Sequence, residues 1–148
     1  MAEASEHLTH PVLGKLGWLP EFSHWFTQLP LPFGRWLDVI VDPGDGDRHE
    51  FIEPAVGLLL RALKAEPRIR RQAIRAELLD LYNDTWRQAD AAVLSADELV
   101  SRLKLALVDV GTVVPVTLHY EARELFGGHS IAVELDERLR FDGLDLQG

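Results

Sequence analysis

The sequence predicts an α+β fold, in which strands from both ends of the chain form one largely antiparallel sheet, and two long helices and one short helix cover one face of it. Segments rich in β-branched and aromatic residues occur before residue 42 and again after residue 104, whereas the stretch between them has helical periodicity. This order of strands, helices and strands is typical of α+β domains. No linker or repeat interrupts the chain, so we expect a flexible tail over residues 1–10 and a single α+β domain over residues 11–148.

Three strands are expected before the first helix, within residues 12–16, 22–29 and 36–41. The last of these has the sequence WLDVIV, which combines aromatic and β-branched side chains. Pro30 and Pro32 restrict the backbone between the second and third strands, and they predict a stiff extended connection. The glycines and aspartates of residues 42–47 then predict a turn that leads into a helix.

Three helices are expected in the middle of the chain, over residues 47–65, 68–88 and 96–102. Pro54 fits the first helix only in its first turn, because a proline there has no hydrogen bond to lose. Pro67 predicts the break between the two long helices, since proline lacks the N–H that a helix interior needs. Ser95 and Glu98 have the spacing of a capping box, which predicts the start of the short helix.

Four further strands are expected after the helices, within residues 105–110, 113–120, 130–135 and 139–146. Pro115 cannot donate a hydrogen bond to a neighbouring strand, so the second of these should lie at a sheet edge or contain a bulge. Before the third strand, the string LFGGHSI has paired glycines that free the backbone and place His129 at the start of the strand.

The composition excludes several classes of function. The chain has 148 residues, a net charge of −9 and no cysteine. The absence of cysteine excludes disulfides, thiolate catalysis and cysteine-ligated metal centres, and it fits a cytoplasmic protein. The acidic balance disfavours nucleic acid as a partner. The first ten residues do not resemble a secretion signal, and no apolar run approaches the ~20 residues that span a bilayer, so no membrane association is expected.

One stretch of the sequence departs from the acidic balance. Residues 1–60 carry 3 basic and 9 acidic side chains, and residues 100–148 carry 5 basic and 8 acidic ones. Between them lies a cluster of basic residues with Glu66 as its only acid: Arg61, Lys64, Arg68, Arg70, Arg71 and Arg75. A solvated helix face is the simpler interpretation of this cluster, and docking of an acidic ligand or partner is the alternative.

No complete catalytic or metal-binding motif is present in the sequence. His49 and Glu50 occupy the first two positions of a helical zinc motif, but Glu53 stands where that motif has its second imidazole. Asp42, Asp45 and Asp47 do not have the alternating spacing of a calcium-binding loop. The sequence therefore predicts neither a metal ion nor another cofactor.

Four strings occur in order along the chain: PVLGKL at residues 11–16, LYNDTW at 81–86, LSADEL at 94–99 and LFGGHSI at 125–131. Together they resemble a bacterial domain-of-unknown-function family, DUF2262. The resemblance implies no particular reaction, but it singles out Asn83, Trp86 and His129 as positions to test. Small acidic bacterial domains of this kind resemble immunity proteins that bind toxins, which is an analogy only.

Two functions remain open from the sequence. The first is a protein-binding module that recognises a basic partner protein, with Trp18, Trp25 or Trp36 as an anchor if one of them is exposed rather than packed in the core. The second is a small-ligand-binding protein or a hydrolase-type enzyme. Its site would gather the side chains of Asn83, Trp86, Glu124 and His129 near the C-terminal strands.

Geometry distinguishes these functions. A hydrolase-type site requires Glu124 and His129 to meet in one concave pocket, where carboxylate and imidazole can exchange protons near neutral pH. If His129 is buried and hydrogen-bonded to the backbone, with no cavity beside it, the hydrolase-type proposal fails. A metal site using His119 and His129 is a third, weaker alternative.

Overall fold

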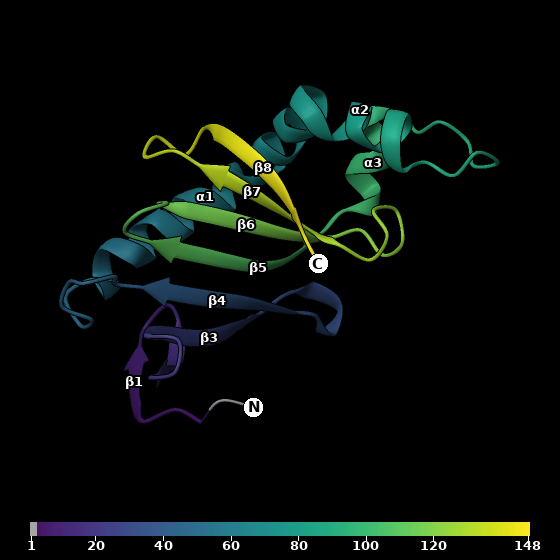
Figure 1. Cartoon of the computed structure of the whole chain (residues 1–148). Coiled ribbons are helices and arrows are strands. Elements are labelled where there is room, and N and C mark those ends of the chain that lie inside the picture. The colour runs from purple at the N-terminus through teal and green to yellow at the C-terminus, as the bar shows by residue number, and fades with distance from the viewer. Residues whose placement is uncertain (1–2) are drawn as a thin grey trace.

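The computed structural model describes residues 3–148, which form one eight-stranded sheet with its strands in sequence order (Figure 1). All neighbouring strands are antiparallel except β4 and β5, which are parallel. The largely antiparallel α+β architecture is therefore confirmed. The strands are β1 (Glu6–His10), β2 (Gly14–Leu19), β3 (His24–Pro30), β4 (Trp36–Asp42), β5 (Lys104–Gly111), β6 (Val116–Glu121), β7 (Ser130–Leu135) and β8 (Phe141–Gln147).

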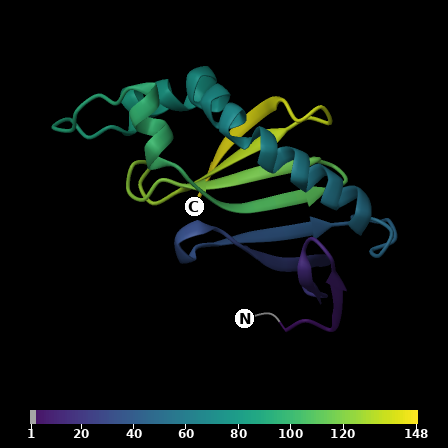
Figure 2. The same ribbon diagram turned by 180° about the vertical axis from the view of Figure 1, so that it is seen from behind.

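The α- and π-helical segments connect β4 to β5 and cross one face of the sheet, behind the strands in Figure 1 and in front of them in Figure 2. A 3-10 turn at Pro32–Gly34 joins β3 to β4, where an extended connection is expected. A single helical stretch runs through α1 (Ile52–Ala73), α2 (Leu79–Leu81) and two π-helical turns, Ile74–Leu78 and Tyr82–Trp86. The short α3 (Ala96–Arg102) follows, and Ser95 and Glu98 form the expected capping box at its start.

The predicted break between two long helices is wrong, because Pro67 lies inside α1. A proline within a helix removes a hydrogen bond and costs about 3 kcal/mol. Apolar side chains before and after it, including Leu59, Ala62 and Ile69, are buried against the sheet. Their burial on both sides offsets that loss and keeps the helix continuous, while Pro67 itself faces solvent.

The N-terminal tail expected over residues 1–10 contains a strand, while its first two residues lie outside the described part. Strand β1 pairs with β2, from Glu6 opposite Trp18 to His10 opposite Gly14. His10 is buried, accepts a hydrogen bond from the Val12 amide at Nδ1 and lies 2.5 Å from a Glu53 carboxylate oxygen at Nε2. Residues 6–10 are therefore held in place by contacts with distant parts of the chain. Their polar composition, taken alone, indicates a flexible tail.

Pro115 also lies elsewhere than expected. It belongs to the turn between β5 and β6, where its carbonyl accepts from the Gly111 amide, and β6 begins at the next residue. Because Pro115 precedes the strand, β6 can be an interior strand between β5 and β7. The missing N–H of proline is thus placed where no strand partner needs it.

The two faces of the sheet differ. Toward α1, alternate residues of β4 to β7 are buried, among them Val39, Val108, Leu118 and Val133. The residues between them point to the opposite face, which no helix covers in the views of Figures 1 and 2. We call this second side the open face.

Candidate functional site

Two of the predicted site residues, Asn83 and His129, are held by backbone groups. The Asn83 side chain donates to the Leu94 carbonyl at 2.9 Å and accepts from the Leu94 amide at 3.0 Å. It thereby closes the loop between the helical stretch and α3. The His129 Nδ1–H donates to the Phe126 carbonyl at 2.8 Å.

Trp86 ends the helical stretch and packs against the β6–β7 loop. Its ring centroid lies 5.3 Å from that of His129 and 6.3 Å from that of Phe126. The backbone of Gly127 also lies against the indole, because a Cβ built on that residue would be 3.0 Å from the ring. Trp86 is therefore fixed on its loop side by three successive contacts.

Trp86 and Glu124 line a cavity of about 750 Å³, whereas Asn83 and His129 do not. The cavity lies where the end of the helical stretch, α3, the start of β5 and the β6–β7 loop meet. Its charged lining comprises Arg102, Lys104 and Arg123, with Glu124 as the one acid among the described residues. We call it the cationic pocket.

Sequence reasoning missed these three basic residues, because none of them lies in the basic cluster of residues 61–75. Arg102 ends α3, Lys104 begins β5 and Arg123 lies in the β6–β7 loop. Only the fold brings them together. One local signal existed in the sequence, since residues 100–104 carry two cations and no acid.

A glutamate–arginine pair fixes one side of the cationic pocket. Arg70 donates to both carboxylate oxygens of Glu66, at 2.8 and 3.0 Å, and the Tyr120 hydroxyl donates to the same carboxylate at 2.8 Å. Arg70 also donates to the carbonyls of Val100 and Leu103, at 3.2 and 2.9 Å. It thus holds the backbone on both sides of Arg102.

The rest of the basic cluster forms no pocket among the described residues. Arg61, Lys64, Arg68 and Arg75 are exposed along the helical stretch, and Arg71 pairs with Asp97 at 2.9 Å. The cluster is thus largely a solvated helix face.

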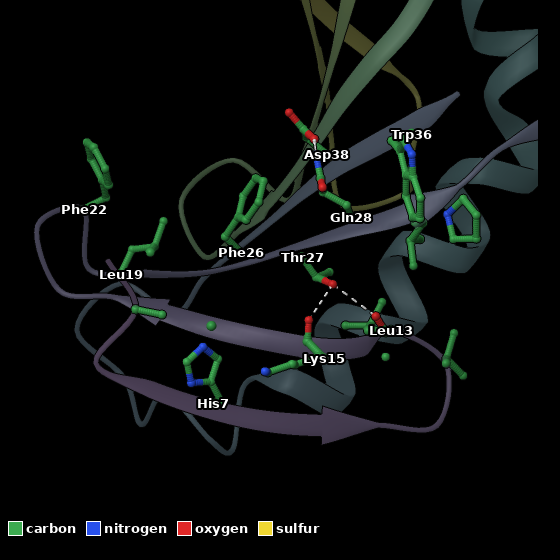
Figure 3. A pocket seen from close by; sticks show the side chains of 16 residues that line it. His7, Leu13, Lys15, Leu19, Phe22, Phe26, Thr27, Gln28, Trp36 and Asp38 are labelled. Atoms are coloured by element: carbon green, nitrogen blue, oxygen red, sulfur yellow. Dashed lines mark hydrogen bonds between the residues drawn. The ribbon is translucent and has the colours of Figure 1, made fainter. Parts of the chain in front are cut away.

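A second cavity, of about 980 Å³, opens at the other end of the sheet (Figure 3). The register of β2 with β3 extends from Leu19 opposite His24 only to Gly17 opposite Phe26. Beyond that point the Thr27 hydroxyl bridges the strands and lies 2.9 Å from the Lys15 carbonyl, to which it donates. We call the resulting space the N-terminal hollow. Its lining includes His7, Lys15, Phe22, Phe26, Trp36 and Asp38.

The three N-terminal tryptophans have different environments. Trp25 is fully buried, and its Nε1–H donates to the Arg48 carbonyl at 2.9 Å. Trp18 packs edge-on against Trp25 and lies beneath the Arg48 guanidinium, 4.7 Å from its ring centre. Trp36 is instead 58% exposed at the rim of the N-terminal hollow, and Phe22 is 57% exposed (Figure 3).

Carboxylates extend from this hollow across the open face. Strand alternation and register place five of them there: Asp38, Asp42, Asp109, Glu134 and Asp145. Burial, together with the negative charge of Asp42, raises the pKa of Asp109 to about 6. Burial lowers the pKa of His24, which stacks on Phe22, and Asp42 opposes that shift.

Within residues 3–148, no group of three or more histidine, aspartate or glutamate side chains is arranged to hold a metal ion. His119, on the open face, and His129, in the β6–β7 loop, do not form such a group. None of the described helices is long and apolar enough to cross a membrane.

Comparison with known proteins identifies a family and nothing more specific. Residues 36–145 match DUF2262, described as an uncharacterized protein conserved in bacteria. Three of the four strings that carry the sequence resemblance lie inside this range, and PVLGKL at residues 11–16 lies before it. No curated protein and no solved structure matches the chain significantly. Because the match begins with β4 and covers most of the chain, this protein belongs to the DUF2262 family.

Proposed function

We propose that this protein is a protein-binding module that uses the open face of its sheet to hold a partner segment with basic and apolar side chains. The exposure of Trp36 at the rim of the N-terminal hollow carries the proposal. Tryptophan supplies much of the binding energy in many protein interfaces when it enters a pocket on the partner.

The charges beside Trp36 define the partner. Asp38 lies two residues further along β4, and Asp109 and Glu134 continue the acidic surface on β5 and β7. A segment with lysine or arginine side chains fits this surface, and long-range attraction accelerates its association. A toxin with a basic surface is one partner of this chemistry, by analogy with immunity proteins.

The experiment identifies the partner first and then tests the surface. Tagged protein is incubated with an extract of the native host, and a stoichiometric partner is purified and titrated calorimetrically against variants. We expect Trp36→Ala to weaken binding by roughly thirtyfold or more, as for an interface anchor. Leu60→Ala is the matched control, because Leu60 is 47% exposed on α1, which covers the opposite face.

Two results contradict the proposal. One is an extract that yields no stoichiometric partner. The other is a partner whose affinity falls as much with Leu60→Ala as with Trp36→Ala, which would place the interface on the helical side.

A further inference from the structure

We propose that the cationic pocket is a binding site for a phosphate monoester attached to a flat ring, as in a nucleoside monophosphate. The site uses none of the residues assigned to partner docking. Its phosphate end is formed by Arg102 and Arg123 with Lys104 beside them, and its flat wall is formed by Trp86.

The charge of the lining fits a phosphate monoester. Arg102, Lys104 and Arg123 contribute three positive charges and Glu124 one negative charge, within a protein of net charge −9. The lining residues alone thus carry an excess of two positive charges, which suits a phosphate monoester of about −1.5 to −2 near neutral pH, and neighbouring acidic residues outside the lining reduce this excess.

The three cations also lack ionic partners within residues 3–148. Glu121 lies opposite Lys104 on the neighbouring strand and attenuates its charge. Glu98 lies near Arg102, but its carboxylate accepts from the Ser95 amide in the capping box. Arg102 and Arg123 therefore remain available for an anion, and their planar guanidinium groups suit phosphate oxygens.

The backbone at Arg123 is compatible with this role, although Ser23, Phe33 and Leu139 also have positive φ in other turns. Arg123 has φ +49°, in the left-handed region that residues other than glycine, asparagine and aspartate seldom adopt. Strain of this kind persists where the surrounding structure enforces it, and such positions are frequent in ligand sites. The strained turn places Arg123 in the lining of the cationic pocket.

Trp86 provides a rigid surface for the organic part of the ligand. Its contacts with Phe126, Gly127 and His129 fix one side of the indole, while the residue also lines the cavity. Any nucleic-acid base can stack on an aromatic side chain, whichever base it is. Such stacking contributes strongly to nucleotide binding in other proteins. Tyr82, Gln88 and Ser101 add a phenol ring and polar groups to the lining.

The proposal is tested with adenosine monophosphate, adenosine and inorganic phosphate as separate probes, by calorimetry at low ionic strength on the full chain. We expect saturable binding of adenosine monophosphate that is tighter than binding of either part alone. Arg123→Asn should weaken it roughly ten- to hundredfold, as expected for the loss of hydrogen bonds to a charged group. Asparagine tolerates the left-handed backbone, so the variant should keep its fold.

Arg68→Asn is the matched control, because Arg68 is an exposed arginine of α1 that does not line the pocket. Trp36→Ala should leave nucleotide affinity unchanged, which separates this site from partner docking. The proposal is overturned if adenosine monophosphate gives no saturable binding at millimolar concentration. It is also overturned if adenosine binds equally well, or if Arg68→Asn weakens binding as much as Arg123→Asn.

Discussion

The N-terminal hollow and the cationic pocket differ in their relation to the family. Of the residues that line the N-terminal hollow, only Trp36 and Asp38 lie within the matched range, whereas every residue that lines the cationic pocket does. If members of the family share a binding property, we therefore expect it first at the cationic pocket. A partner particular to this chain is to be sought first at the hollow.

The two regions are also held open in different ways. The hollow exists because the pairing of β2 with β3 stops at Gly17 opposite Phe26, and a Thr27 hydroxyl bridges the gap. The walls of the cationic pocket are fixed by side chains that bind backbone carbonyls, chiefly Arg70 and Asn83. Variants of Arg70 or Asn83 should therefore disturb the cationic pocket and leave the N-terminal hollow intact.

Among the polar and exposed side chains of the two regions, Glu66→Gln should have the largest effect on stability. Glu66 and Arg70 side chains are only 13% and 18% exposed, so the variant leaves a largely buried guanidinium without its carboxylate. We expect a loss of about 3 kcal/mol in the free energy of unfolding, measured by urea denaturation. Weaker adenosine monophosphate binding should accompany it, because Arg70 holds the backbone around Arg102.

Glu77→Gln is the control for this prediction, since Glu77 is exposed on the same helical stretch. If Glu66→Gln and Glu77→Gln have equal stabilities, the pair does not support the pocket wall.

The regions differ as well in how far the sequence predicts them. The capping box at Ser95 and strand β4 follow from local signals, and both are confirmed. The break at Pro67 fails because tertiary burial on both sides of the proline outweighs its local preference. Strand β1 is missed because its order depends on distant contacts such as His10 with Glu53.

Some residues of the candidate sites can also be predicted from the sequence, whereas others are brought together only by the fold. The family resemblance singles out Trp86, the hydrolase hypothesis adds Glu124, and both residues line the cationic pocket. The basic residues of that pocket could not be predicted, because Arg102 and Arg123 are distant in sequence and meet only when β6 returns beside β5. Likewise, composition does not show which of the N-terminal tryptophans is exposed.

Asn83→Ala should have the next largest effect. The variant removes both hydrogen bonds to the Leu94 backbone, so we expect a loss of about 2 kcal/mol in the free energy of unfolding. Asn83→Asp keeps an acceptor for the Leu94 amide and should lose less. Hydrogen exchange of the Leu94 amide measures the local opening. Unchanged exchange in Asn83→Ala would show that the loop is closed by other contacts.

Asp109 should make stability depend on pH. Its pKa is about 6 in the folded protein, above the value of ~3.9 for an unfolded aspartate. The folded state therefore binds more protons between these values, and stability should fall as the pH rises from 4 to 6. Asp109→Asn should remove about 1–2 kcal/mol of this decline, as measured by denaturation at several pH values. An unaltered pH profile would contradict the assignment to Asp109.

Trp36→Ala should have the smallest effect on stability and the most selective effect on binding. Because the side chain is 58% exposed, its removal should cost less than about 1 kcal/mol in the free energy of unfolding. By contrast, Trp25→Ala removes a fully buried ring and should cost about 3–5 kcal/mol. If Trp36→Ala abolishes partner binding while adenosine monophosphate binding and stability persist, the two regions act independently. Loss of nucleotide binding together with partner binding would show instead that the open face and the cationic pocket are coupled through the sheet.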